Sequence, residues 1–171
     1  DPFEIAEQFF GRSPFRREPR IPRYGLTLNF MEAAKGCEKE VAVGNKKRKI
    51  HVPAGVDDGS RIKFRDFYLT INVEPDEIFR RDGYDLFLDQ KVPFTMAILG
   101  GFIEVPTIDK PVKLKIRPGT QPGTLIRLRN KGVPHLHGRG RGDQYIRLLV
   151  EIPKKLSKKQ ERLFEEFKKE A

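Results

Sequence analysis

The chain carries the run Phe30-Met31-Glu32-Ala33-Ala34-Lys35-Gly36 and repeats it as Phe94-Thr95-Met96-Ala97-Ile98-Leu99-Gly100, a shift of 64 residues (from 30 to 94). The same shift relates further residues in order, Glu40-Val41 to Glu104-Val105 and Gly55 and Gly59 to Gly119 and Gly123. Two copies of roughly fifty to sixty residues indicate tandem domains of similar fold rather than one large core. We therefore expect an elongated binding scaffold without a single catalytic centre.

Apolar residues alternate with polar ones in each copy, and this period of two predicts strands. From Tyr24 the alternation runs through Leu26, Leu28 and Phe30. Further strands are expected over 38–43 and 48–52, joined by a tight turn at Gly44-Asn45. Residues 75–84 are expected to contain a short helical turn and a turn at Arg81-Asp82-Gly83. The expected fold class is mainly β: two tandem small β-sandwich domains with a short N-terminal helix and a C-terminal helix.

Four segments are expected along the chain. Residues 1–22 form a linker with a short helix, 23–84 the first β-sandwich domain, 85–153 the second, and 154–171 the C-terminal helix. Ser157 and Gln160 have capping-box spacing at the start of that last helix. Its apolar stripe, Leu163, Phe164 and Phe167, fits either docking on its own domain or a contact between subunits, and the sequence leaves both open.

Composition narrows the class of protein. The chain has 171 residues, with one cysteine and three histidines. It begins at Asp1 rather than Met, and we therefore expect it to be a fragment of a longer protein. With Cys37 alone no internal disulfide is expected, and these residues are too few for a closed structural zinc site. A reducing, cytoplasmic setting is expected, with no membrane span, because no stretch approaches the roughly 20 apolar residues that a span needs.

The formal net charge of +10 would suit a nucleic-acid-binding protein. The basic residues are scattered, however, and acidic residues interrupt most of the basic runs, so a solvated surface is the favoured interpretation. No catalytic group of residues emerges either, because His135 and His137 have no partnering carboxylate pair or cysteine. We therefore expect no enzyme, no metal and no cofactor.

Five motifs occur in an order that resembles the carboxy-terminal substrate-binding region of the DnaJ family of J-domain co-chaperones. They are Tyr24-Gly-Leu-Thr-Leu-Asn-Phe-Met-Glu-Ala-Ala-Lys-Gly-Cys-Glu-Lys-Glu-Val41, Val52-Pro-Ala-Gly-Val-Asp-Asp-Gly-Ser-Arg-Ile62, Ile78-Phe-Arg-Arg-Asp-Gly-Tyr-Asp-Leu86, Ala97-Ile-Leu-Gly-Gly-Phe-Ile-Glu-Val-Pro-Thr107 and Gly138-Arg-Gly-Arg-Gly-Asp143. The resemblance covers about residues 1–15 and 23–167. Two parts of many family members are missing from this sequence: the J domain and the cysteine-rich zinc modules, whose place Gly44-Asn45 takes.

The resemblance implies a peptide-binding pocket in the first domain. Carried over residue by residue, that pocket falls on Leu28, Phe30, Val41, Val43 and Phe79. Positive charge near it, on Lys39, Lys46, Lys47 and Lys49, would suit the acidic tail of a DnaK-type chaperone. The family's dimerisation through its extreme C-terminus would fall on Leu163, Phe164 and Phe167.

Three functions stay open on the sequence. The leading one is a co-chaperone module that captures unfolded, hydrophobic polypeptide segments and, in the full protein, delivers them to a DnaK-type chaperone, as a weak homodimer. The first alternative is a basic nucleic-acid-binding β protein, and the second a purely structural dimerisation scaffold. Salt separates the first two, because phosphate binding weakens steeply as salt rises.

Overall fold

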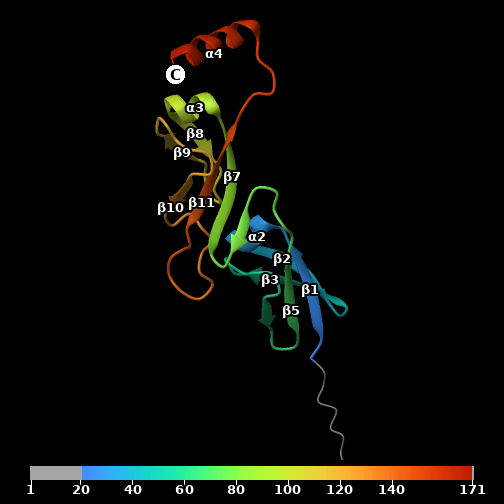
Figure 1. Cartoon of the computed structure of the whole chain (residues 1–171). Helices are drawn as coiled ribbons and strands as arrows, with labels where there is room; N and C mark the ends of the chain where they lie inside the picture. The colour runs from blue at the N-terminus through green and yellow to red at the C-terminus, as the bar shows by residue number, and fades with distance from the viewer. Residues whose placement is uncertain (1–20, 171) are drawn as a thin grey trace, which may run out of the picture.

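Two β units follow one another along the chain in the computed structural model, which describes residues 21–170 (Figure 1). The first holds β1 (Arg23–Leu28), α2 (Phe30–Lys35), β2 (Cys37–Val43), β3 (Lys46–Val52), β4 (Arg61–Lys63) and β5 (Tyr68–Val73). The second holds β6 (Arg80–Asp82), β7 (Asp85–Pro93), α3 (Phe94–Leu99), β8 (Gly101–Val105), β9 (Val112–Ile116), β10 (Leu125–Leu128) and β11 (Gln144–Glu151), and α4 (Lys158–Glu170) follows it. The mainly β class and the C-terminal helix are confirmed; the predicted N-terminal helix and linker lie outside the described residues.

The two units have the same topology, as the repeat in the sequence predicts. In the first, β5 lies between β1, which runs parallel to it, and β4, which runs antiparallel; β2 and β3 form a separate hairpin. In the second, β11 lies between parallel β7 and antiparallel β10, and β8 and β9 form the hairpin. Gly36 and Gly100, which end the matching helices, have φ of 77° and 78°, a region that favours glycine.

Two predictions about local structure are wrong. The strand that begins near Tyr24 does not continue to Phe30, because the side chain of Asn29 accepts a hydrogen bond from the Glu32 amide and caps a helix. Residues 75–84 form no helical turn. The carboxylate of Asp76 accepts hydrogen bonds from the amides of Ile78 and Phe79, and the chain then enters β6, which pairs with β7 of the second sheet.

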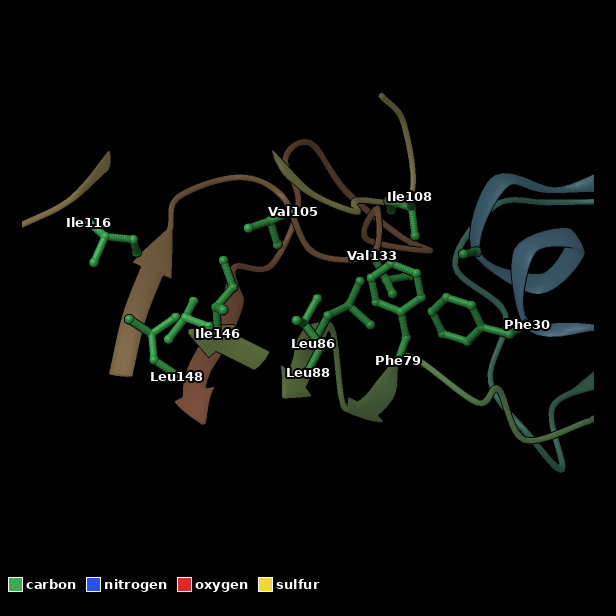
Figure 2. Packing of buried hydrophobic residues seen from close by; sticks show 12 residues of the cluster. Phe30, Phe79, Leu86, Leu88, Val105, Ile108, Ile116, Val133, Ile146 and Leu148 are labelled. Atoms are coloured by element: carbon green, nitrogen blue, oxygen red, sulfur yellow. The ribbon is translucent and has the colours of Figure 1, made fainter. Parts of the chain in front are cut away.

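Two apolar clusters fill the molecule, and one of them joins the units. The first cluster includes Leu28, Phe67 and Leu69 and belongs to the first unit. The second fills the second unit but also includes Phe30, which comes from α2 of the first (Figure 2). Phe30 stacks on Phe79 with the ring centroids 5.4 Å apart and the planes 16° apart. This buried aromatic pair is therefore an inter-unit contact.

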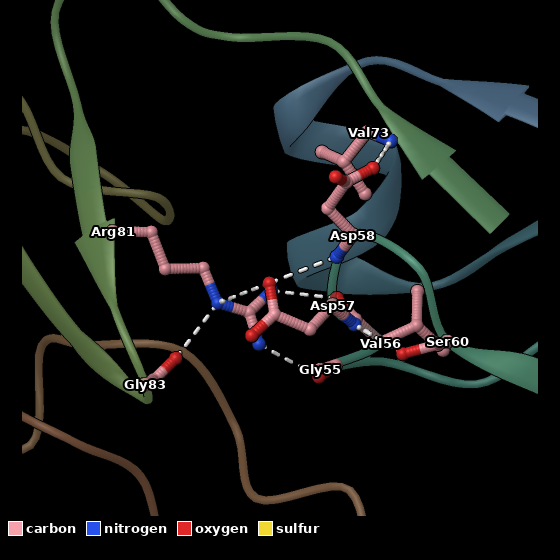
Figure 3. Close-up of polar contacts among 8 residues, drawn as sticks. All are labelled: Gly55, Val56, Asp57, Asp58, Ser60, Val73, Arg81 and Gly83. Carbon is pink, nitrogen blue, oxygen red and sulfur yellow. Dashed lines mark hydrogen bonds and ion pairs between the residues drawn. The ribbon is translucent and has the colours of Figure 1, made fainter.

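Arg81 adds a polar contact between the units (Figure 3). From β6 its Nη1 donates to the carbonyl of Val56 at 2.6 Å and its Nη2 to that of Gly55 at 2.9 Å, while Nε donates to Gly83 at 2.8 Å. Burial lowers the pKa of this guanidinium, and the carboxylate of Asp57 opposes that shift. A guanidinium stays charged in proteins, and two of its donors hold the Gly55–Val56 loop of the first unit against the second, while the third binds the β6–β7 turn.

The long connection between β10 and β11 completes the contact. Its Leu136 packs against the first unit's cluster, and a Cβ added to Gly55 would collide with the carbonyl oxygen of Pro134. Arg141 fastens the connection to its own unit through Asp109 at 2.6 Å. We call the inter-unit contact the joint, defined by Phe30, Gly55, Phe79, Arg81 and Leu136.

Replacing Gly55 by Ala should destabilise the chain by about 2 kcal/mol or more, because the new Cβ meets Pro134 and the backbone is held at a φ of 91°. The matched control is Gly59→Ala, where φ is 74° but no atom lies within 4 Å of the added carbon. That control should lose only about 1 kcal/mol, the cost of the backbone conformation alone. Urea unfolding of both variants gives the comparison, and equal losses would contradict a close approach at the joint.

Candidate functional site

Four strand edges of the first unit have no partner among the described residues, one each on β1, β2, β3 and β4, and those of β1 and β2 are relevant to binding. β1 pairs only with β5, and β2 only with β3. Lys39 of β2 forms an ion pair with Glu32 of α2, and the amide of Gly44 donates to the hydroxyl of Tyr24 on β1 at 3.1 Å. Arg48 of β3 instead binds Asp66, in the β4–β5 connection. The open edges of β1 and β2 therefore lie on the same side of the unit, with β3 turned away from them.

Apolar side chains from both strands line this side. Tyr24 and Leu26 of β1 and Val43 of β2 are half-buried, and Val41 is 9% exposed. They occupy alternate positions, so within each strand they share one face. We call these four residues the β1–β2 face. It combines free main-chain hydrogen-bonding groups with apolar side chains that are only partly covered, which is the combination that an extended peptide needs.

The structure separates the five residues predicted for the peptide pocket. Val41 and Val43 lie together on β2, and Leu28 lies in the same cluster but is only 1% exposed. Phe30 and Phe79, each 5% exposed, are in the joint. The role of the five in binding peptide stays a prediction.

Two residues of the β1–β2 face were not among those predicted. Tyr24 and Leu26 begin the very alternation that indicates β1, so the signal was present in the sequence. The alternation also gives Leu28 with Phe30 and Val41 with Val43 as same-face apolar pairs, and the resemblance implies that these pairs face the groove. The side chains of Tyr24 and Leu26 are half-buried, so both belong to the β1–β2 face.

The predicted lysines differ in their partners. Lys39 and Lys49 form ion pairs with Glu32 and Glu38, whereas Lys46 and Lys47 form none with the residues that the structure describes. In the hairpin register Lys46 lies opposite Val43. The two unpaired ammonium groups therefore lie at the end of the β1–β2 face. Whether they bind an acidic tail stays a prediction.

Helix α4 begins as predicted, with Ser157 and Gln160 exchanging capping-box hydrogen bonds. It lies over α3, where the ring of Phe164 is 5.4 Å from that of Phe94 (Figure 1). Phe164 is 38% exposed and Phe167 is 65% exposed. The helix thus contacts its own unit through one aromatic residue and leaves the rest of its apolar stripe uncovered.

Within residues 21–170 the structure offers little support for a metal site or a nucleophilic cysteine. No group of three or more His, Cys, Asp or Glu side chains in that range is placed to hold a metal ion. Burial raises the pKa of the Cys37 thiol, so this side chain is less nucleophilic than a free cysteine. No helix in that range is long and apolar enough to cross a membrane.

Comparison with known proteins identifies a family. Residues 23–153 match the model of the DnaJ C terminal domain. The chaperone protein DnaJ of Clostridium perfringens is 46% identical over 138 residues, which cover 73% of this chain and 36% of that protein. That of Clostridium tetani is 48% identical over 128 residues, covering 67% and 34%, and that of Halalkalibacterium halodurans 45% over 135 residues, covering 71% and 36%. The chain spans about a third of the length of these relatives.

The ion pair beside the β1–β2 face predicts a pH response. The hydrogen bond from Lys39, followed by that from the Asn29 amide, lowers the pKa of the Glu32 carboxyl. Because the folded pKa lies below the unfolded one, the stabilising contribution is present above the unfolded pKa and is lost as pH falls through the folded pKa. Carboxyl NMR titration should show Glu32 titrating low, and Lys39→Met should raise its pKa. An unchanged pKa in Lys39→Met would contradict the arrangement of β2 beside α2.

Proposed function

This chain belongs to the DnaJ C-terminal domain family, and from that premise we propose that it captures apolar segments of unfolded polypeptides on the β1–β2 face. The family is one of chaperones, so the expectation that the chain is not an enzyme is confirmed. The chain covers only part of its relatives, and its binding of clients is therefore proposed from its own surface.

The observation that carries the proposal is the pair of open strand edges flanked by half-buried apolar side chains. A bound segment adds to β2 as a further strand, and its main chain forms the hydrogen bonds that the edge leaves free. Its alternate side chains cover Tyr24, Leu26 and Val43. Main-chain pairing is independent of sequence, and the apolar contacts favour segments that a folded protein would bury.

In this proposal the buried residues of the predicted pocket stabilise the fold and do not contact the peptide. Leu28 lies in the apolar cluster against which Tyr24, Leu26 and Val43 pack. Phe30 and Phe79 hold the two units together, and a peptide would reach them only by opening the joint. The proposed contact residues are therefore the four of the β1–β2 face.

The partner in the cell is proposed to be a DnaK-type chaperone. Lys46 and Lys47, at the end of the β1–β2 face, offer positive charge to an acidic tail, and Lys39 and Lys49 would first have to leave their present carboxylates. A cytoplasmic location suits this partnership and the single thiol of Cys37.

Replacing Val43 by Ser should weaken binding of a fluorescent apolar heptapeptide roughly tenfold, because about 1.5 kcal/mol of apolar burial is lost. Val43 is only half-buried, so the variant should keep its circular dichroism spectrum. Leu125→Ser is the control, since Leu125 is an apolar strand residue with an exposed side chain in the second unit.

Equal affinities of wild type and Val43→Ser would contradict the proposed face. Anisotropy titrations at two salt concentrations test the nucleic-acid alternative in the same experiment. Capture of an apolar peptide should change little with salt, whereas binding driven by phosphate contacts should fall steeply.

The uncovered stripe of α4 is proposed to form a weak dimer in the micromolar range, because one short helix buries a small interface. Sedimentation should show a concentration-dependent mass that Phe167→Glu abolishes. Lys169→Gln makes the same change in charge on the same helix and should leave the mass unaffected. A monomer at every concentration would mean that α4 serves only its own unit, through Phe164 and Phe94.

A further inference from the structure

The outer face of the first sheet is polar and basic. Leu69 and Ile71 of β5 point into the core and are fully buried, so Tyr68 and Thr70 point to the other side. The register places Arg23 of β1 beside Tyr68 and Arg61 of β4 beside Thr70. Arginines from both edge strands therefore flank the two hydroxyl-bearing residues of the central strand.

These four residues line a cavity of about 260 Å³. Over the part of the chain that the structure describes, neither Arg23 nor Arg61 forms an ion pair. Gly25 pairs with Thr70 at the edge of the cavity and contributes no side chain. We call this feature the arginine cradle, defined by Arg23, Arg61, Tyr68 and Thr70.

The second unit shows the same face with a carboxylate in place. The repeat relates Gly25 to Asp89 and Thr70 to Arg147, and these two pairs are neighbours in the equivalent register. Arg147 donates from Nε and Nη2 to the two oxygens of Asp89, each at 2.8 Å, and Arg80 lies 3.3 Å away. The second unit thus pairs this carboxylate with its own arginines. The first unit has Gly25 in place of the acid and Thr70 in place of Arg147, and its two arginines stand where the second unit has Phe87 and Leu125.

We propose that the arginine cradle binds a carboxylate from an acidic segment of another polypeptide. The position of Asp89 shows which group this face of the fold accommodates, and the missing side chain at Gly25 leaves its place open. Two guanidinium groups supply charge-assisted hydrogen bonds, and the hydroxyls of Tyr68 and Thr70 supply further donors. Asp89 is a carboxylate, which favours an acidic peptide over a phosphate-bearing ligand.

The arginine cradle is distinct from the β1–β2 face. Successive residues of a strand point to opposite sides, so Arg23 lies on one side of β1 and Tyr24 and Leu26 on the other. Lys46 and Lys47 belong to the separate β2–β3 hairpin. An acidic segment and an apolar client can therefore be held by the same unit at once, and the two sites can fail independently.

Gly25→Asp is the decisive variant because it builds into the first unit the carboxylate that the second already has. A Cβ at Gly25 meets nothing nearer than the side-chain amide of Asn72 at 3.5 Å, and its backbone has no positive φ, so the variant should fold. Gly25→Asn is the matched control, with the same shape and no charge.

The test is fluorescence anisotropy of a labelled peptide of alternating Glu and Gly, titrated with the full chain at low ionic strength. Gly25→Asp, Arg23→Gln and Arg61→Gln should each weaken binding by roughly tenfold or more. Gly25→Asn fills the same space without the charge, so it should weaken binding less than Gly25→Asp does. Lys115→Gln, which removes one positive charge from an exposed position on β9 of the second unit, should change the affinity less than threefold, as expected for a distant screened charge.

Three results would overturn the proposal. They are wild-type affinity in Gly25→Asp, loss of binding in Lys115→Gln alone, and stronger binding of inorganic phosphate than of the acidic peptide in competition. Binding of the apolar heptapeptide should be the same in Gly25→Asp and wild type, so failure of the arginine cradle is distinguishable from failure of the β1–β2 face.

Discussion

The rest of the structure depends on the joint between the two units. A loop carbonyl that is buried without a donor costs free energy, and Arg81 supplies donors to those of Gly55 and Val56. Phe30 and Phe79 add a stacked, desolvated aromatic contact (Figure 2). The joint thereby uses Phe30 of the first unit and Phe79, which directly precedes β6, for packing. The residues proposed to bind peptide lie instead along the open edges of β1 and β2.

The two units share a topology, but the residues at their exposed positions differ. On the outer face of the large sheet, Gly25 and Arg61 in the first unit correspond to Asp89 and Leu125 in the second. On the inner side, Leu26 and Val43 correspond to Gln90 and Thr107, so only the first unit presents a continuous apolar face. Several fully buried strand positions, by contrast, are apolar in both copies, because each unit must fill a core: Leu28 corresponds to Val92, Leu69 to Ile146 and Ile71 to Leu148. Duplication of the fold therefore preserved the packing while the exposed positions diverged.

Local sequence rules predicted the elements that local interactions determine. The Gly44-Asn45 turn and the capping box at Ser157 both follow from residues close in sequence. Phe30 was misplaced because the alternation of apolar residues continues across the cap, although Asn29 and Glu32 have capping-box spacing. The joint could not be predicted in the same way. Its partners, such as Arg81 and Gly55, are 26 residues apart, and no periodic pattern relates them.

The central claim is that an apolar segment adds as a strand to the open edge of β2. Amide hydrogen exchange followed by NMR, with and without a saturating apolar heptapeptide, tests it most directly. The account predicts new protection at alternate amides of residues 37–43, the period expected when one edge of a strand gains a partner. Protection confined to the second unit, or chemical-shift changes centred on Phe30 and Phe79 without protection in β2, would contradict it.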